Sequence, residues 1–266
     1  MANPTEPEIL KLSYVDMGTL KVPPPEAQLW RFMDLAKLVS MLDHSALYFP
    51  VLASLNDELE GSSPRPPQTA TDEERLRAYD TWQYNRTVLF VNCWHQSDDE
   101  SAAMWALYGN QGVAVRTTFG LLSKAVHQCP SANPVPDLTV VGGMVDYLSP
   151  DETSPLAGAS NPIADALRKL RWYDYEKEVR LIYHLRSNCE RFASFPCAKK
   201  KGVWVKCSLP AAICAIVLAP RSPSFLEEAV RAVCTKFGLD PSLVQRSRIE
   251  QGVPSVWTFS DLSIRS

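Results

Sequence analysis

The stretch CWHQSDDESAAMWALYG, residues 93–109, joins a short apolar strand to an acidic helix rich in aromatic residues. The apolar run before it, residues 88–91, has the composition of a β-strand. Ser97 is a favourable N-cap residue, and Glu100 three positions later completes a capping-box pattern. The sequence therefore predicts a strand-to-helix junction here, the kind of place where functional sites are built.

Composition limits the classes of function. The 266 residues include 27 basic and 30 acidic side chains, which gives a net charge of -3 and no general positive field for a nucleic-acid backbone. The N-terminus lacks a signal-peptide pattern, and no apolar run is long enough to span a bilayer. We therefore expect a cytoplasmic protein with no membrane contact and no general nucleic-acid binding.

Cysteine usage agrees with that compartment. Seven cysteines, none in a CxxC pair, suit reduced and mostly buried thiols. No zinc-ligand spacing, phosphate-binding glycine loop or catalytic triad signature stands out, so no metal is expected.

The order of expected elements predicts the fold class. Residues 1–28 resemble a Pro-rich N-terminal arm, and residues 29–266 a single α+β domain. The domain opens with a strand at 29–32, a helix at 35–42 and a strand at 46–51. Because no strict βαβ repeat follows, we expect a mixed, largely antiparallel twisted sheet with flanking helices.

The remaining pattern supplies the other elements. We expect further helices at 72–85, after Phe119, at 163–172 and at 224–237, the last of which ends at Gly238. Expected strands are 112–117, 139–147, 178–184, 202–208 and 214–219. Segments rich in Pro, Ser and Thr, at 61–71, 129–136 and 149–162, are expected loops, and residues 199–202 an exposed hairpin turn.

The predicted helix after residue 97 carries the first candidate site residues. Ser101, Trp105 and Tyr108 share one face, which could form the floor of a pocket. The alternative is that Trp105 and its neighbour Met104 are core residues and that Glu100 only caps the helix.

Cys93 and His95 form the second candidate. They are two residues apart on an extended segment, so their side chains point to the same side and could form a thiolate–imidazole pair. The alternative is that His95 is a hydrogen-bonded structural residue, since no third orienting group can be identified.

The segment YEKEVR, residues 175–180, is the third candidate. In a strand, Glu176, Glu178 and Arg180 would share one face, opposite a strongly apolar one. They would then form either a solvated edge with a Glu178–Arg180 pair or the polar wall of a cleft.

Arg31 lies alone in the apolar stretch LWRFM, where its five donors need anions or carbonyl groups. It would either pair with Glu58, Glu60 or Glu178, or bind a phosphate group of a ligand.

Several of these motifs, in the order LWRFMDLAKLVSML, CWHQSDDESAAMWALYGNQGVAVRTT and RWYDYEKEVRLIYH, resemble the bacterial domain-of-unknown-function family 2971 over residues 29–247. The resemblance implies the domain boundaries. It implies no chemistry, because that family has no assigned activity.

A shorter motif order resembles that of ADP-ribosyltransferases: Arg31 on a first strand, Thr117-Thr118 after a middle strand, and Glu176-x-Glu178 at a later strand. The resemblance implies that Arg31 holds the pyrophosphate of NAD and that Thr117 and Thr118 support the site. It also implies that Glu178 stabilises the oxocarbenium-like transition state and that Glu176 orients the acceptor. The nicotinamide ring would stack on an aromatic residue, Trp94, Trp105 or Tyr108.

The leading hypothesis is therefore an enzyme that takes a nucleotide-like ligand, with NAD as substrate for ADP-ribosyl transfer or NAD cleavage. One alternative is a non-catalytic regulatory module that binds a protein partner through the 175–180 face. Another is a metal-dependent nuclease or hydrolase that uses the carboxylates of Glu60, Glu100, Glu176 and Glu178.

Overall fold

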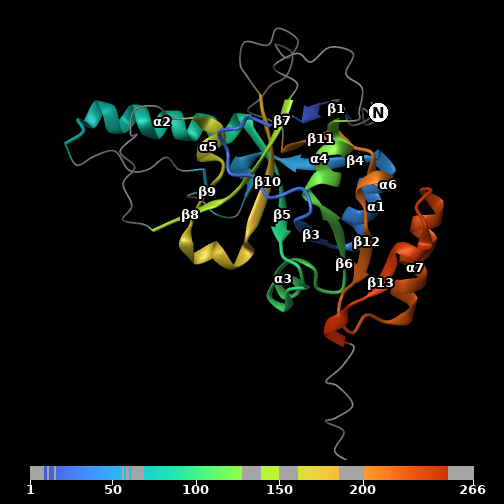
Figure 1. Ribbon diagram of the computed structural model, residues 1–266. Helices are drawn as coiled ribbons and strands as arrows, with labels where there is room; N and C mark the ends of the chain where they lie inside the picture. Colours follow the sequence, from blue (N-terminus) through green and yellow to red (C-terminus); the bar gives the residue numbers. More distant parts are fainter. Residues whose placement is uncertain are drawn as a thin grey trace, which may run out of the picture.

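An eight-stranded sheet forms the centre of the protein in the computed structural model, which describes residues 9–10, 12–14, 16–55, 57, 60–61, 69–127, 139–149, 161–185 and 201–250 (Figure 1). Its strand order is β13-β12-β6-β3-β5-β10-β7-β2. Neighbouring strands are antiparallel except at the two ends, where β13 pairs with β12 and β2 with β7 in parallel. The chain therefore has the α+β fold with a mixed, mostly antiparallel sheet that its sequence predicts. The strands are β2 (Ser13–Tyr14), β3 (Gln28–Met33), β5 (Leu89–Gln96), β6 (Val113–Thr118), β7 (Thr139–Met144), β10 (Glu178–His184), β12 (Ala215–Leu218) and β13 (Val244–Arg246).

Two smaller sheets complete the β-structure. One contains β1 (Ile9–Leu10), β11 (Gly202–Lys206) and β4 (Ala46–Pro50), and an isolated bridge between Val51 and Phe90 joins its end to β5. Phe49 and Phe90 are fully buried in the main core, which these sheets share. The other is a parallel pair of β8 (Asp146–Leu148) and β9 (Arg168–Leu170).

Helices cover the sheets and connect them. Helix α1 (Leu35–His44) joins β3 to β4, and α7 (Ser224–Lys236) lies beside β12 and β13 (Figure 1). Helix α2 (Asp72–Val88) buries only residues near its C-terminal end, and its first turns extend away from the body. The others are α3 (Ala102–Tyr108), α4 (Phe119–His127), α5 (Pro162–Asp165) and α6 (Leu209–Ala212), with 3₁₀ turns η1 (Leu52–Ser54), η2 (Arg171–Glu176), η5 (Pro241–Leu243) and η6 (Arg248–Glu250).

The main sheet divides between β3 and β5. β3 pairs with β6 along all six of its residues, but with β5 only at Leu29–Gln96 and Trp30–His95. Beyond those pairs β5 continues beside β10 as far as Leu89. From Arg31 onward, β3 and β5 therefore separate, and side chains between them do not have to follow the alternation of one continuous sheet.

The predicted N-terminal arm contributes to both larger sheets. β1 pairs with β11, and β2 pairs with β7. Leu10 is 7% exposed and Leu12 is fully buried in the main core. Part of the arm thus belongs to the folded domain.

Most predicted elements are confirmed, including the strand–helix–strand opening and the helix that ends before Gly238. Gly238 has φ +74°, and the amide of Leu239 donates to the carbonyl of Cys234, as in a helix-terminating turn. The predicted loops and the 199–202 turn lie largely or partly outside the described residues.

Three predictions about elements are wrong. The helix expected at 163–172 ends at Asp165, because residues 168–170 pair with β8 instead. The strand expected at 139–147 is divided at Val145 into β7 and β8. Ser97 is not a cap: α3 starts later, and Ser101 accepts the hydrogen bond from the Met104 amide.

Candidate functional site

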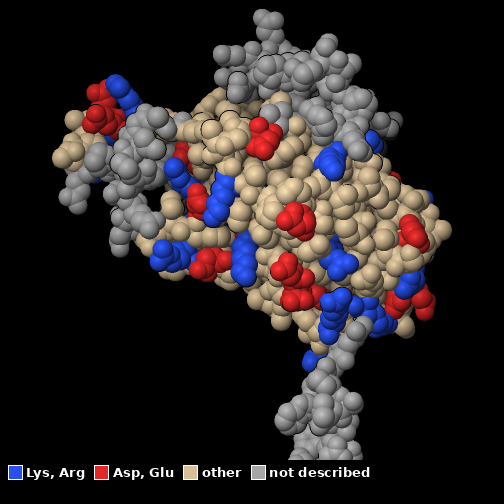
Figure 2. Space-filling model, viewed as in Figure 1, with Lys and Arg blue, Asp and Glu red and all other residues tan. Residues whose placement is uncertain are grey.

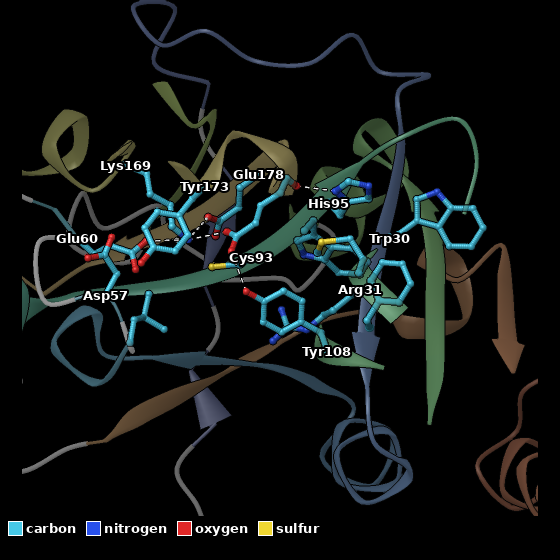
Figure 3. Close-up of a pocket in the computed structure, with 15 residues that line it drawn as sticks. Trp30, Arg31, Asp57, Glu60, Cys93, His95, Tyr108, Lys169, Tyr173 and Glu178 are labelled. Atoms are coloured by element: carbon cyan, nitrogen blue, oxygen red, sulfur yellow. Dashed lines mark hydrogen bonds and ion pairs between the residues drawn. The ribbon is translucent and has the colours of Figure 1, made fainter. Parts of the chain in front are cut away.

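A cavity of about 310 Å³ lies where β3 and β5 separate. Its walls come from β3, β5 and β10, from α3 and η2, and from Lys169 on β9. Leu55, Asp57 and Glu60 complete the lining. Figure 3 shows Glu60 and Asp57 at one end of this group of side chains and Trp30 at the other. Segments far apart in the sequence thus meet around one space of a size typical of small-molecule sites.

Arg180 is the central cation of the polar wall. Its guanidinium binds both carboxylate oxygens of Glu178, at 3.0 and 2.8 Å, and donates at 2.5 Å to the carbonyl of Ala166. It also pairs with Glu60, and its side chain is fully buried. The alternative of a solvated strand edge is therefore wrong: Glu178 and Arg180 share one face of β10 as predicted, but that face is covered.

Lys169 connects the three carboxylates. Its Nζ lies 2.5 Å from Glu176, 3.5 Å from Glu178 and 3.8 Å from Glu60. Burial acts to lower the pKa of Lys169, but the carboxylates of Glu178 and Glu176 outweigh it and raise the pKa above the usual range. Three carboxylates thus share two cations, Lys169 and Arg180, so this group of five carries one excess negative charge when all are ionised.

Glu176 holds two other side chains in place. Its carboxylate accepts a hydrogen bond from the Tyr108 hydroxyl at 2.8 Å, and its main-chain carbonyl lies 2.5 Å from Nδ1 of His95. The next residue, Lys177, is left-handed with φ 40°, which turns the chain from η2 into β10. This turn brings Glu176 and Glu178 to the same cavity although only Glu178 belongs to the strand.

His95 lines the cavity and is 5% exposed. Burial lowers its pKa below the usual value, and the hydrogen bond to the Glu176 carbonyl only partly offsets this effect. His95 is therefore neutral at neutral pH.

Cys93 does not form the predicted pair with His95. Burial and the hydrogen bond from its thiol to the Glu178 carboxylate raise the pKa of Cys93 well above its usual value. The thiol therefore stays protonated, which removes the basis for a cysteine nucleophile.

Arg31 has a different environment from Arg180. Its guanidinium carbon lies 5.8 Å from the centre of the Trp94 ring, and the side chain lines the cavity. Within the described part of the chain it makes no hydrogen bond or ion pair, and its Nη1 is buried without a partner. The predicted pairings with Glu60 and Glu178 are absent there, and Glu58 lies outside the described residues. Arg31 is thus a cation beside the cavity whose N–H donors form no hydrogen bond with the described residues.

The structure separates the predicted site residues into two groups. Glu176, Glu178, Arg31, Trp94 and Tyr108 line the cavity. Thr117, Thr118 and Trp105 do not.

The excluded residues have other contacts. Thr117 donates to the Ala212 carbonyl at 2.6 Å, and Thr118 accepts from the Leu121 amide at the start of α4. The indole of Trp105 donates at 3.0 Å to Glu100. These contacts explain the three residues as structural parts of the fold.

Glu100 lies apart from the other predicted carboxylates. It binds Trp105, the Ser247 hydroxyl and the Arg248 amide, whereas Glu60, Glu176 and Glu178 share Lys169. Among the residues that the structure describes, no three His, Cys, Asp or Glu side chains are placed to hold a metal ion. Of the four carboxylates in the hydrolase hypothesis, the structure therefore brings three together and leaves Glu100 apart.

Sequence reasoning missed Lys169, Tyr147 and Tyr173. Tyr147 accepts the Glu178 amide at 2.8 Å, and the Tyr173 ring lies 4.7 Å from the Lys169 ammonium. Lys169 lies in the segment predicted as a helix, residues 163–172. A single lysine in a helix does not indicate a functional site.

The charges on the outer surface are mixed. On the face in Figure 2, Lys and Arg side chains are interspersed with Asp and Glu. No helix in the described ranges is both long enough and apolar enough to cross a bilayer.

Comparisons with protein-family models, with curated proteins and with solved structures give no match for this chain.

Proposed function

We propose that the cavity binds NAD and that the protein breaks the bond between its ribose and nicotinamide, passing ADP-ribose to water or to another acceptor. The observation that carries the proposal is the meeting of Arg31, Glu178 and Tyr108 around one cavity. An unpartnered guanidinium, a fixed carboxylate and an aromatic ring match the phosphates, the ribose and the base of a dinucleotide.

The charge of the polar wall fits the reaction. The nicotinamide group of NAD is cationic, and positive charge moves onto the ribose as the glycosidic bond breaks. A carboxylate fixed beforehand stabilises such a charge because it needs no reorganisation during the reaction. The excess negative charge of the group formed by Glu60, Glu176, Glu178, Lys169 and Arg180 supports this assignment.

Glu178 is the residue we assign to the transition state. Burial raises its pKa, whereas the Lys169 ammonium and the Cys93 thiol favour its ionised form. The two-pronged contact with Arg180 fixes the plane of the carboxylate. Arg31, which lines the same cavity from β3, is assigned to the phosphates. Thr117 and Thr118 are left out of the proposed site.

The test is nicotinamide release from NAD by the wild type and by Arg31→Gln, Glu178→Gln and the control Glu228→Gln. Glu228 is exposed on α7, remote from the cavity lining. We expect release by the wild type and the control. Arg31→Gln should lower kcat/KM about 10- to 100-fold, as expected for lost charge-assisted hydrogen bonds. Glu178→Gln should lower kcat about 10²- to 10³-fold.

Glu178→Gln disturbs a buried ion network, so its folding is checked by near-UV circular dichroism. Arg31→Gln removes no hydrogen bond among the described residues and tests the proposal if Glu178→Gln does not fold. Absence of nicotinamide release by the folded wild type contradicts the proposal.

A further inference from the structure

We infer that His95 is the proton acceptor for the attacking nucleophile in this cavity, with Nε2 as the accepting atom. This inference rests on the proposed function and adds a second catalytic residue to it. Neither the motif order nor the carboxylate wall assigns any role to His95.

The contact with Glu176 determines which ring nitrogen is available. A main-chain carbonyl can only accept a hydrogen bond, so the Nδ1 that lies 2.5 Å from it carries the proton. In the neutral ring Nε2 then has the free lone pair. Among the described residues nothing donates a hydrogen bond to Nε2, while the ring itself lines the cavity.

The fold holds this ring beside the proposed reaction centre. In the sheet, His95 is directly opposite Glu178 on β10 and Trp30 on β3, at the last pair before β3 and β5 separate. Side chains of directly paired residues project to the same face of a sheet. Nucleophile activation by His95 and charge stabilisation by Glu178 would thus act on neighbouring atoms of one substrate.

The surroundings of His95 suit a base that is neutral before the reaction and charged after it. On β3 and α3 it meets apolar groups, including the Phe32 ring at 6.3 Å, which together with burial favour the neutral form. The charged or titratable groups around it are Arg31 of β3, Cys93 of β5, Tyr108 of α3, Glu176 of η2, the following Lys177, and Glu178 of β10. The two carboxylates would stabilise the imidazolium ion once it forms.

The step balances with water as the nucleophile. The bond between ribose C1′ and the nicotinamide nitrogen breaks, and its electron pair leaves with the neutral nicotinamide. A lone pair of water forms the new C1′–O bond, and the proton that this oxygen loses moves to Nε2 of His95. The imidazolium later releases the proton to solvent, so NAD and water give ADP-ribose, nicotinamide and a proton.

The test compares water with azide as the nucleophile in the wild type, His95→Gln and His44→Gln. Azide has no proton to lose, so its reaction does not need a base. His44 is a matched control, because its Nδ1 also lies near a main-chain carbonyl, that of Ser40 at 2.7 Å, but the residue is on α1 and does not line the cavity. His95→Gln should slow hydrolysis about 10²- to 10⁴-fold and leave azide transfer close to wild type.

A second measurement uses His95→Gly with added imidazole. Imidazole should restore hydrolysis in proportion to its neutral fraction, so the restored rate should rise with pH through the imidazole pKa.

An unchanged hydrolysis rate in His95→Gln overturns the role of His95 and leaves the proposed function intact. Equal losses with water and azide, without imidazole rescue, also overturn it, since they indicate a structural residue. A wild type that releases no nicotinamide at all defeats the proposed function, and the role of His95 with it.

Discussion

Arg31 and Arg180 show how differently one residue type is used on two central strands. Arg180 is fully buried and binds two carboxylates and a carbonyl. Arg31 lines the cavity with a buried nitrogen that has no partner. Arg180 therefore contributes to the fold, whereas Arg31 has a free donor beside the cavity.

Arg180→Met is expected to lower the free energy of unfolding by about 3–5 kcal/mol, because it leaves the carboxylates of Glu60 and Glu178 buried with less compensation. Arg31→Met should change it by less than about 1 kcal/mol, since no described hydrogen bond is lost. Urea denaturation of both variants measures the difference. Equal losses would show that Arg31 is a structural residue.

His95 should make stability depend on pH. Its pKa is lowered by folding, so the unfolded chain, with a pKa near the ordinary 6.5, binds more protons in the range below that value. The free energy of unfolding should be highest above pH 6.5 and fall as the pH decreases through 6.5 towards the folded pKa. Urea denaturation from pH 7.5 downward should show a smaller decrease of the free energy of unfolding in His95→Gln than in the wild type. The same decrease in both proteins would refute the lowered pKa of His95.

Sequence reasoning identified Arg31, Glu176 and Glu178, because charged residues in an apolar context are conspicuous. It identified Tyr108 from the aromatic face of the helix predicted after residue 97. It also included Thr117, which does not line the cavity: Thr117 pairs with Leu29, and its hydroxyl donates to the Ala212 carbonyl in the core. No residue of β6 lines the cavity. Which strands border the cavity depends on the assembled sheet, and motif order alone does not contain this information.

At the scale of single elements, α3 begins four residues later than the capping-box pattern predicts. The Glu100 carboxylate does not accept a hydrogen bond from the Ser97 amide, as it would in a capping box. It accepts hydrogen bonds from Trp105, Ser247 and Arg248 instead. Long-range hydrogen bonds therefore replace the local motif, which is a tertiary effect that a local pattern cannot reveal.

Ser101→Ala should lower the free energy of unfolding by about 1 kcal/mol, because it removes the side-chain bond to the first turn of α3. Ser97→Ala should have a smaller effect, since among the described residues its hydroxyl accepts only the nearby Asp99 amide. Thermal unfolding of the two variants gives the comparison. A larger loss from Ser97→Ala would support the cap predicted from the sequence.

The long elements were predictable and the short ones were not. Apolar periodicity located β3, α1, β10 and α7 because each buries a regular set of side chains. β1 and β2, with two residues each, and β9, with three, are too short to carry a period. Their pairing comes from the assembled sheets.

At the scale of the whole molecule, the cavity depends on the division of the main sheet. Lys169 and Glu178 come from the second half of the chain, and Arg31 and His95 from the first. The sequence predicted one α+β domain, but it contained no signal for the separation of β3 from β5 or for the bridge that joins the smaller sheet to β5 at Phe90.

The N-terminal segment should matter for global stability. Leu12→Ala is expected to cost about 2–5 kcal/mol, because Leu12 is fully buried in the main core between β1 and β2. Met17→Ala, at a residue 40% exposed, should change stability by less than about 0.5 kcal/mol. Urea denaturation checks both, and equal effects would mean that the segment is a loosely attached arm.

The two ends of the main sheet also bear on aggregation. A long outer strand offers a row of free main-chain groups that can recruit strands from other molecules. In the described chain this sheet ends in β13, with three residues, and β2, with two, so each outer edge is short. The stretch of β3 that does not pair with β5, residues 31–33, faces inward, where Phe32 and Met33 are buried. The strand edge that could make a ligand site is thus kept away from other copies of the protein.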